Sequence, residues 1–123
     1  MKQHETKWQL YIMYSLIIVF ILTANIVLGQ NICKTDICVV EFNAGWNSSN
    51  SVSWLKKLDD CSVKKINIDK GDWAKKYNIV VVPTIIVFNG KEVERFQADI
   101  SFAMRANLED VQDVIDEILM EDF

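Results

Sequence analysis

The sequence predicts a small α/β domain, a four-stranded mixed sheet with three helices, behind an N-terminal hydrophobic segment. Three observations predict this class. The first is that the apolar patterns follow the order strand, helix, strand, helix, strand, strand, helix. The second is that an Asn-Gly pair separates the last two strand-like runs, and the third is that an amphipathic stretch ends the sequence. The chain has 123 residues, with 13 basic and 17 acidic side chains, which suffices for one domain with a modest core.

Residues 1–29 have the layout of an export segment. Lys2 and Lys7 precede 19 residues, 10–28, that carry no charge. As a helix this run would extend to about 28 Å, close to the roughly 30 Å hydrocarbon thickness of a bilayer. We therefore expect a cleaved signal peptide or an uncleaved signal anchor, and both place residues 30–123 outside the cytoplasm: periplasmic, secreted or membrane-anchored.

The charge of residues 30–123 restricts the partners. Removing residues 1–29 takes away two lysines and one glutamate, which leaves 11 basic against 16 acidic side chains and a net charge of −5. This balance disfavours nucleic acid and anionic membrane surfaces as partners. We expect membrane contact only through residues 10–28, if that segment is uncleaved.

The first half of the domain reads as two strands and two helices. Residues 38–43 are β-rich, and Gly45 follows as a breaker. In residues 51–58 apolar side chains recur every third position behind a cluster of Asn and Ser, which predicts a short capped helix. A second strand is expected over residues 63–68 and a second helix over residues 71–77.

The second half reads as a hairpin and a helix. A run of three valines ends at Pro83, the only proline. Residues 84–88 and 92–96 flank Asn89 and Gly90, a strong hairpin signal. The last helix should begin after the cap Asn107, with an apolar face formed by Leu108, Val111, Ile115, Ile118 and Leu119.

Four motifs resemble the thioredoxin family: Val-Val-Glu-Phe-Asn-Ala-Gly-Trp at 39–46, Lys-Ile-Asn-Ile-Asp at 65–69, Val-Pro-Thr at 82–84 and Phe-Asn-Gly-Lys at 88–91. The resemblance runs from about residue 38 to residue 118 and implies a minimal thioredoxin fold, without the extra N-terminal strand of larger thioredoxins. It implies that Val82-Pro83 is a cis peptide facing the place where the family carries Cys-x-x-Cys after the tryptophan matched by Trp46. Here that place reads Asn47-Ser48-Ser49-Asn50.

This departure bears on chemistry. Thiol–disulfide exchange requires a thiolate, and the carboxamides of Asn47 and Asn50 cannot supply one or form a mixed disulfide. Dithiol catalysis is thus excluded at this site, which argues against an enzyme. We expect no cofactor and no metal, because His4 lies in the export segment and three cysteines without a histidine make a poor zinc site.

The resemblance also places Glu41 as a buried acid and Lys65 as its neighbour on the next strand. A structural ion pair is the favoured interpretation, since removing one partner of a buried pair is costly. A role in a residual site is the alternative.

Three cysteines, Cys33, Cys38 and Cys61, allow one disulfide in an oxidising compartment. The two-residue period of a strand puts Cys38 on the face opposite Glu41, and Cys61 on the face of Lys65. We predict a Cys33–Cys61 disulfide, with a relocated redox pair Cys33–Cys38 as the alternative.

Two functions of different class follow. The first is a non-catalytic module that binds an extended protein or peptide segment in a groove formed by Trp46, Asn47, Val82 and Pro83, with a free backbone edge beside the proline. The second is a thiol–disulfide oxidoreductase of altered chemistry that uses Cys33, Cys38 or Cys61. A structural domain for assembly at a membrane is a third possibility.

Overall fold

The computed structural model describes residues 9–16, 33 and 36–121. The chain divides into two units, Met1–Ile32 and Cys33–Phe123. In the first, residues 9–16 are helical, and the remainder of the expected export segment lies outside the described residues. Over the described ranges, no helix combines the length and the apolar character needed to cross a membrane.

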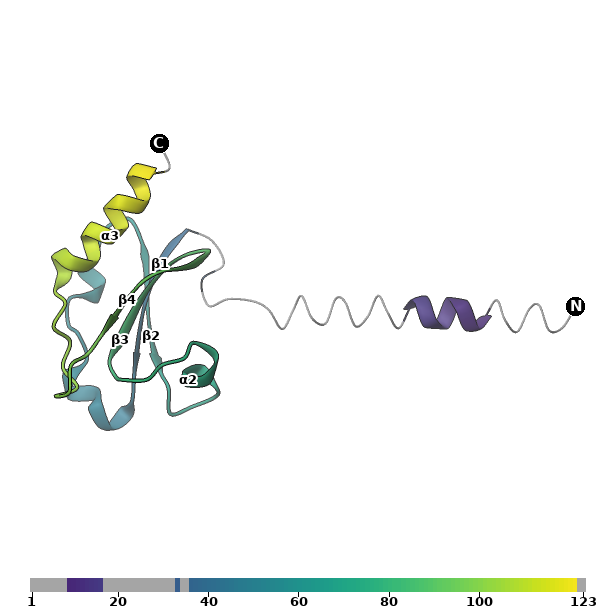
Figure 1. Cartoon of the computed structure of the whole chain (residues 1–123), viewed down its shortest axis with the longest axis horizontal. Helices are drawn as coiled ribbons and strands as arrows, with labels where there is room; N and C mark the ends of the chain where they lie inside the picture. The colour runs from purple at the N-terminus through teal and green to yellow at the C-terminus, as the bar shows by residue number, and fades with distance from the viewer. Residues whose placement is uncertain (1–8, 17–32, 34–35, 122–123) are drawn as a thin grey trace, which may run out of the picture. The chain divides into compact units, whose positions relative to one another are not determined.

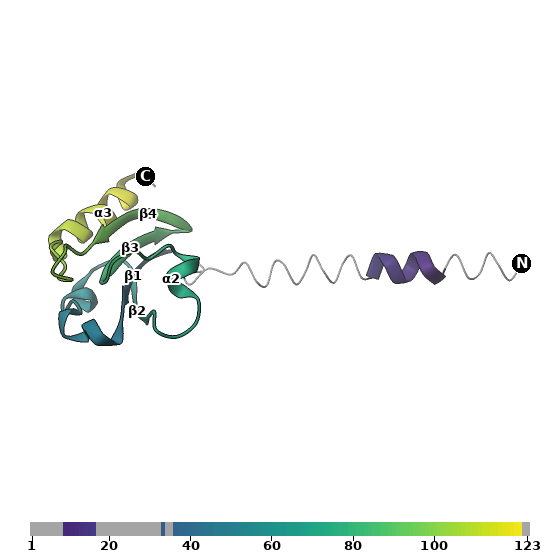
Figure 2. The same ribbon diagram turned by 60° about the horizontal axis from the view of Figure 1, so that its bottom comes forward.

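The second unit is built on a four-stranded mixed sheet, as predicted. The strands are β1 (Ile37–Asn43), β2 (Ser62–Asn67), β3 (Thr84–Asn89) and β4 (Lys91–Gln97), in the order β2-β1-β3-β4 (Figure 2). β1 is parallel to β2 and antiparallel to β3, and β3 and β4 form the expected hairpin. Gly90 closes the hairpin with a φ of 77°, which glycine adopts without strain.

Both faces of the sheet are covered, so β1 is buried along its whole length. One face packs on Val52, Leu55 and Leu58, which follow β1 in the chain, and on α3 (Leu108–Glu121). On the other face, the ring of Tyr77, just after α2, meets Phe42 at a tilt and Phe88 edge-on, at ring-centroid distances of 5.3 and 5.7 Å. Figure 1 shows α3 and α2 on opposite sides of the strands.

The two predicted helices that follow β2 and β4 are present. α2 (Trp73–Lys76) is one turn, and α3 runs over 14 residues with Val111, Ile115 and Ile118 buried. Asn107 caps α3 as expected: the Asp110 N–H donates to its side chain, and the Asn107 N–H donates to the Asp110 carboxylate, both at 2.9 Å.

The helix predicted over residues 51–58 is wrong. The chain forms two 3₁₀ turns instead, η1 (Gly45–Asn50) and η2 (Leu55–Lys57), with extended backbone at Ser51 between them. The Asn/Ser cluster forms η1 itself, which leaves too few residues for a cooperative α-helix. Val52, Leu55 and Leu58 still point into the core. The apolar spacing therefore predicted correctly which side chains are buried, but it predicted the wrong type of helix.

Candidate functional site

Three loops meet at the carboxyl end of β1. They are η1, which follows β1 directly, the Val82-Pro83 peptide before β3, and residues 98–106, which join β4 to α3. The Val82-Pro83 bond is cis, as the resemblance implies. The site that the sequence points to therefore lies at one end of the sheet.

Asn47 joins these three loops through its side chain, which is only 3% exposed. Its Nδ2 donates to the Val82 carbonyl at 3.3 Å, to the Phe102 carbonyl at 3.1 Å and to Asn43 Oδ1 at 3.1 Å. Its Oδ1 accepts a hydrogen bond of 2.8 Å from Asn50 Nδ2. Asn43 Nδ2 in turn donates to the Asn47 carbonyl at 3.0 Å. We call Asn43, Asn47 and Asn50 the amide cluster.

The apolar surface beside the amide cluster comes from a different set of residues. Trp46 is 67% exposed, and its ring meets Phe102 edge-on at 5.0 Å with an interplanar angle of 87°. Phe102 is 41% exposed, and Ile100 in the same loop is 98% exposed. We call Trp46, Ile100 and Phe102 the Trp46–Phe102 surface. Sequence reasoning missed its two loop residues, whose only signal was two bulky apolar side chains between a strand and a helix.

The predicted groove changes accordingly. Of its four residues only Trp46 is exposed, because the side chains of Asn47, Val82 and Pro83 are buried. The prediction of a free backbone edge beside Pro83 is wrong for the carbonyl groups, which already accept hydrogen bonds within the domain. Those of Val81, Val82 and Pro83 accept hydrogen bonds from Thr84 Oγ1, Asn47 Nδ2 and the Ala98 N–H respectively.

A charged brace holds the loop that carries Phe102. The Asp99 carboxylate accepts hydrogen bonds from Ser101 and pairs with the Arg105 guanidinium. These hydrogen bonds, from Ser101 first and then from Arg105, hold the pKa of Asp99 below its usual range. Phe102 sits in the left-handed region with a φ of 61°, uncommon for a bulky residue, so the surrounding bonds fix this turn.

Glu41 and Lys65 lie opposite each other on β1 and β2, in the register that the resemblance implies. Glu41 is 1% exposed, and its carboxylate accepts hydrogen bonds from Ser51 Oγ at 2.6 Å and from the Val52 N–H at 2.7 Å. Lys65 Nζ is farther away, 3.8 Å from Oε1, and its side chain is 47% exposed. The pair is therefore buried only at Glu41, beside an open pocket of about 210 Å³.

The predicted Cys33–Cys61 disulfide is wrong. Cys33 is bonded to Cys38, with 5.9 Å between their Cα atoms, and Cys61 is a free thiol. Strand parity placed Cys38 and Cys61 on opposite faces correctly, since Cys61 packs on the core that contains Ile37 and Val39. Cys33 lies before the first strand, so strand periodicity could not predict its position. The disulfide places it on the same side of the sheet as Cys38.

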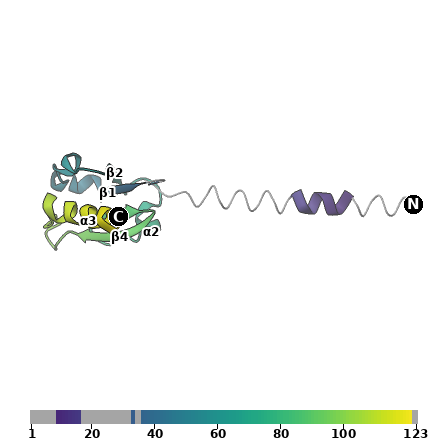
Figure 3. The same ribbon diagram turned by 90° about the horizontal axis from the view of Figure 1, so that it is seen from above.

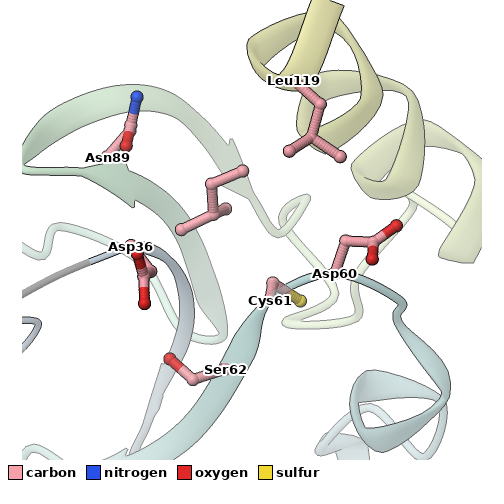
Figure 4. Close-up of a pocket in the computed structure, with 7 residues that line it drawn as sticks. Asp36, Asp60, Cys61, Ser62, Asn89 and Leu119 are labelled. Atoms are coloured by element: carbon pink, nitrogen blue, oxygen red, sulfur yellow. The ribbon is translucent and has the colours of Figure 1, made fainter. Parts of the chain in front are cut away.

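Cys61 lines an open pocket of about 540 Å³ at the start of β2, with Asp36, Asp60, Asn89 and Leu119 around it (Figure 4). Burial and the charges of Asp60 and Asp59 raise the pKa of the Cys61 thiol. A raised pKa lowers the thiolate fraction at neutral pH, which is the opposite of what a reactive cysteine requires.

Comparisons with known proteins support the fold through solved structures alone. No protein-family model and no curated protein matches the chain. A Schistosoma mansoni thioredoxin pre-protein matches with 29% identity and a TM-score of 0.51, over 68% of this chain and 80% of its own. Another Schistosoma mansoni thioredoxin structure matches with 25% identity and a TM-score of 0.54, over 77% and 86%. A mutant thioredoxin from Halobacterium salinarum matches with 24% identity and a TM-score of 0.54, over 68% and 74%. The domain that follows the N-terminal unit has a thioredoxin-like fold.

Proposed function

We propose that this chain is an exported, redox-inactive thioredoxin-like protein whose Trp46–Phe102 surface binds a segment of another protein. One observation carries the proposal: Asn47, at the place of the first motif cysteine, is buried and bonded to two other loops and to the end of β1, while the adjacent aromatic rings stay exposed. A buried amide in that position offers neither a nucleophile nor a sulfur atom.

The arrangement suits binding because the exposed rings are fixed in place. The Trp46 ring packs against the Phe102 ring, and the Phe102 carbonyl accepts a hydrogen bond from Asn47. The ion pair between Asp99 and Arg105 stabilises the loop that carries Phe102. Ordering these side chains costs little entropy on association, since they are ordered beforehand. Exposed aromatic residues with polar neighbours are the usual anchors of protein interfaces.

A photo-crosslinking experiment tests the binding role. A photoreactive amino acid placed at Ile100 should form adducts with a discrete protein, and the same amino acid at Val93, an exposed position on β4, should not. Combining the Ile100 probe with Trp46→Ala should remove those adducts. Equal adducts from both positions would contradict a dedicated surface. Fusing residues 1–29 to a reporter that is active only outside the cytoplasm tests export separately.

The alternative function, disulfide chemistry away from the usual site, has one observation in its favour, the Cys33–Cys38 disulfide. The two residues are only 7% and 0% exposed, which restricts attack on either sulfur. Insulin reduction by the full chain decides between the functions. We expect no turnover, and turnover abolished by Cys33→Ala but retained in Cys61→Ser would establish the alternative.

A further inference from the structure

The turn at residues 99–102 holds an apolar side chain out in solvent. Ile100 is 98% exposed, the highest value among the large apolar side chains of the described residues. The turn is ordered, because the Phe102 N–H donates to the Asp99 carbonyl at 3.0 Å and the Ser101 N–H donates to the Asp99 carboxylate at 2.8 Å. A side chain held in this way loses little entropy on binding and gains most in a hollow, where its whole surface leaves water.

A cation lies beside Ile100. The Arg105 guanidinium pairs through Nε with the carboxylate of Asp99, the residue before Ile100, and the Arg105 side chain is 81% exposed. Arginine has five N–H donors, so the pairing with Asp99 leaves others for a second carboxylate. The hollow that fits this turn should therefore have an apolar floor and an acidic rim.

The chain itself carries such a hollow, the open pocket of about 540 Å³ at the start of β2. We call it the amino-end pocket. Ile37 and Leu119 give it apolar surface, and the exposed Asp36 and Asp60 give it negative charge (Figure 4). No basic side chain of the described residues lines it. Its volume is in the range of pockets that hold drug-sized ligands, so an isoleucine side chain fits.

The turn and the amino-end pocket lie at opposite ends of the domain. β1 begins at the pocket with Ile37 and ends at η1, where Trp46 and Asn47 contact Phe102 of the turn. The rise of a strand puts about 20 Å between the two ends of β1. Ile100 therefore cannot reach the pocket of its own copy.

We propose that Ile100 of one copy enters the amino-end pocket of a second copy, with Arg105 against the acidic rim. The inference rests on the proposed function, since it names the partner of the Trp46–Phe102 surface. The contact joins unlike surfaces at opposite ends of the domain, so each pair leaves one turn and one pocket open for further copies. It adds no strand to β2 or β4, the two edges of the sheet, which Figure 3 shows on opposite sides of the domain.

Charge complementarity supports a second copy as the partner, because one chain carries both halves of the contact. Residues 30–123 have 11 basic and 16 acidic side chains, and this net charge of −5 opposes association. Salt screens that repulsion beyond about 10 Å at 0.1 M, whereas the charges at the rim would be in contact. A contact centred on one isoleucine is smaller than the interface of a stable dimer, so the association should be weak and is best detected by trapping.

Trapping with the thiol of Cys61 tests the contact. One chain carries Ile100→Cys and Cys61→Ser, and its introduced thiol is activated as a mixed disulfide with a coloured leaving group. It is mixed with the unmodified full chain, both in detergent micelles that greatly outnumber the chains. The Cys61 thiolate attacks the introduced sulfur, forms a disulfide between the copies and releases the coloured thiolate. Val93→Cys with Cys61→Ser, at another exposed apolar position, is the matched control.

We expect the Ile100→Cys chain to react with Cys61 at least about tenfold faster than the Val93→Cys chain, because insertion raises the local concentration of the two sulfurs. Peptide mapping should join residue 61 of one copy to residue 100 of the other. Circular dichroism confirms that both variants fold.

A second comparison tests the acidic rim. Asp36→Asn with Asp60→Asn in the otherwise unmodified chain should slow trapping about threefold. Asparagine tolerates the positive φ of both residues, 65° and 62°. The rate is divided by that of the same chain with a small disulfide, because Asp60 raises the pKa of Cys61 and its loss makes the thiol more reactive.

Three outcomes would overturn the proposal: equal trapping rates for the two cysteine positions, a disulfide that does not join residues 61 and 100, or a normalised rate that does not change when both carboxylates are removed. Photo-crosslinking at Ile100 separates this failure from that of the proposed function. If it captures a different protein while Cys61 stays unreacted, the Trp46–Phe102 surface binds a partner that is not a second copy. If neither experiment gives a product, the proposed function fails as well.

Discussion

The two ends of the sheet differ in the chemistry they hold. At the carboxyl end of β1, amide groups meet: Asn43, Asn47 and Asn50 share hydrogen bonds, and no sulfur atom is present in residues 39–58. At the amino end of the same strand lie all three cysteine sulfurs, two in the Cys33–Cys38 disulfide and one in the free thiol of Cys61.

This difference separates structural sulfur from the place where a thioredoxin-like fold would use sulfur. The disulfide is buried, and the free thiol has a raised pKa, so neither is set up as a nucleophile. The amide cluster, in contrast, orders the loops beside the exposed Trp46 and Phe102. Under the proposed function, the amide end would carry recognition as well as stability, and the cysteine sulfurs at the other end stability alone.

Asn47→Ala should have the largest effect on the free energy of unfolding. It removes the donors to Val82, Phe102 and Asn43 and leaves the buried Val82 carbonyl without this hydrogen bond, while Asn43 Oδ1 keeps the Ala44 N–H, so we expect a loss of about 3 kcal/mol. Asn50→Ala is the matched control and should cost about 1 kcal/mol, because it breaks one partly exposed bond. Urea denaturation measures both, and equal losses would mean that Asn47 is not the centre of the cluster.

The disulfide should rank second. Reduction of Cys33–Cys38 opens a short loop, which the chain-entropy model values at about 2 kcal/mol. Cys33→Ala should reproduce the loss, and Cys61→Ser should leave the urea midpoint nearly unchanged. If Cys61→Ser destabilises the protein as much as Cys33→Ala does, Cys33 pairs with Cys61, and peptide mapping without reductant would show it.

Most of the fold could be predicted from sequence, because strand periodicity, the Asn-Gly turn and the Asn107 cap are local signals. Each strand begins and ends within one residue of its prediction. The parallel register of Glu41 and Lys65 depended on the resemblance to a known family. The local pattern predicted the wrong structure at residues 51–58. The Asn/Ser cluster forms the 3₁₀ turn η1 instead of capping an α-helix that follows it.

The site was predicted less well because burial of a polar group depends on partners far away in sequence. Asn47 bonds to Val82 and Phe102, which are 35 and 55 residues away in the sequence. The sequence around residue 47 contains no signal that would predict either partner. Cys33 lies before β1 and belongs to no helix or strand. The two-residue period of a strand, which placed Cys38 correctly, therefore could not predict the position of Cys33.

Lys65→Met should destabilise the protein by about 1 kcal/mol, less than expected for a fully buried pair. Ser51 and Val52 donate to Glu41 at shorter distances than Lys65, so the carboxylate is not stranded when the lysine is removed. Ser51→Ala combined with Lys65→Met should cost more than the two losses added, because the carboxylate then keeps only the Val52 N–H. Thermal melts measure the coupling, and strict additivity would contradict a shared role.

The smallest effect should be a pH dependence at the amide end. Asp99 keeps a lowered pKa in the folded protein, so its brace contributes stability above the ordinary aspartate pKa of about 4 and loses it as the pH falls toward the folded value. We therefore expect the Phe102 ring resonances to keep their positions down to about pH 4 and to move at lower pH. The Asp99 side-chain carbon, followed by NMR, should titrate together with them. Asp99→Asn is the control, in which the low-pH movement of Phe102 should disappear while the sheet resonances remain. An Asp99 midpoint in the ordinary range, with no response at Phe102, would show that the brace does not order the Trp46–Phe102 surface.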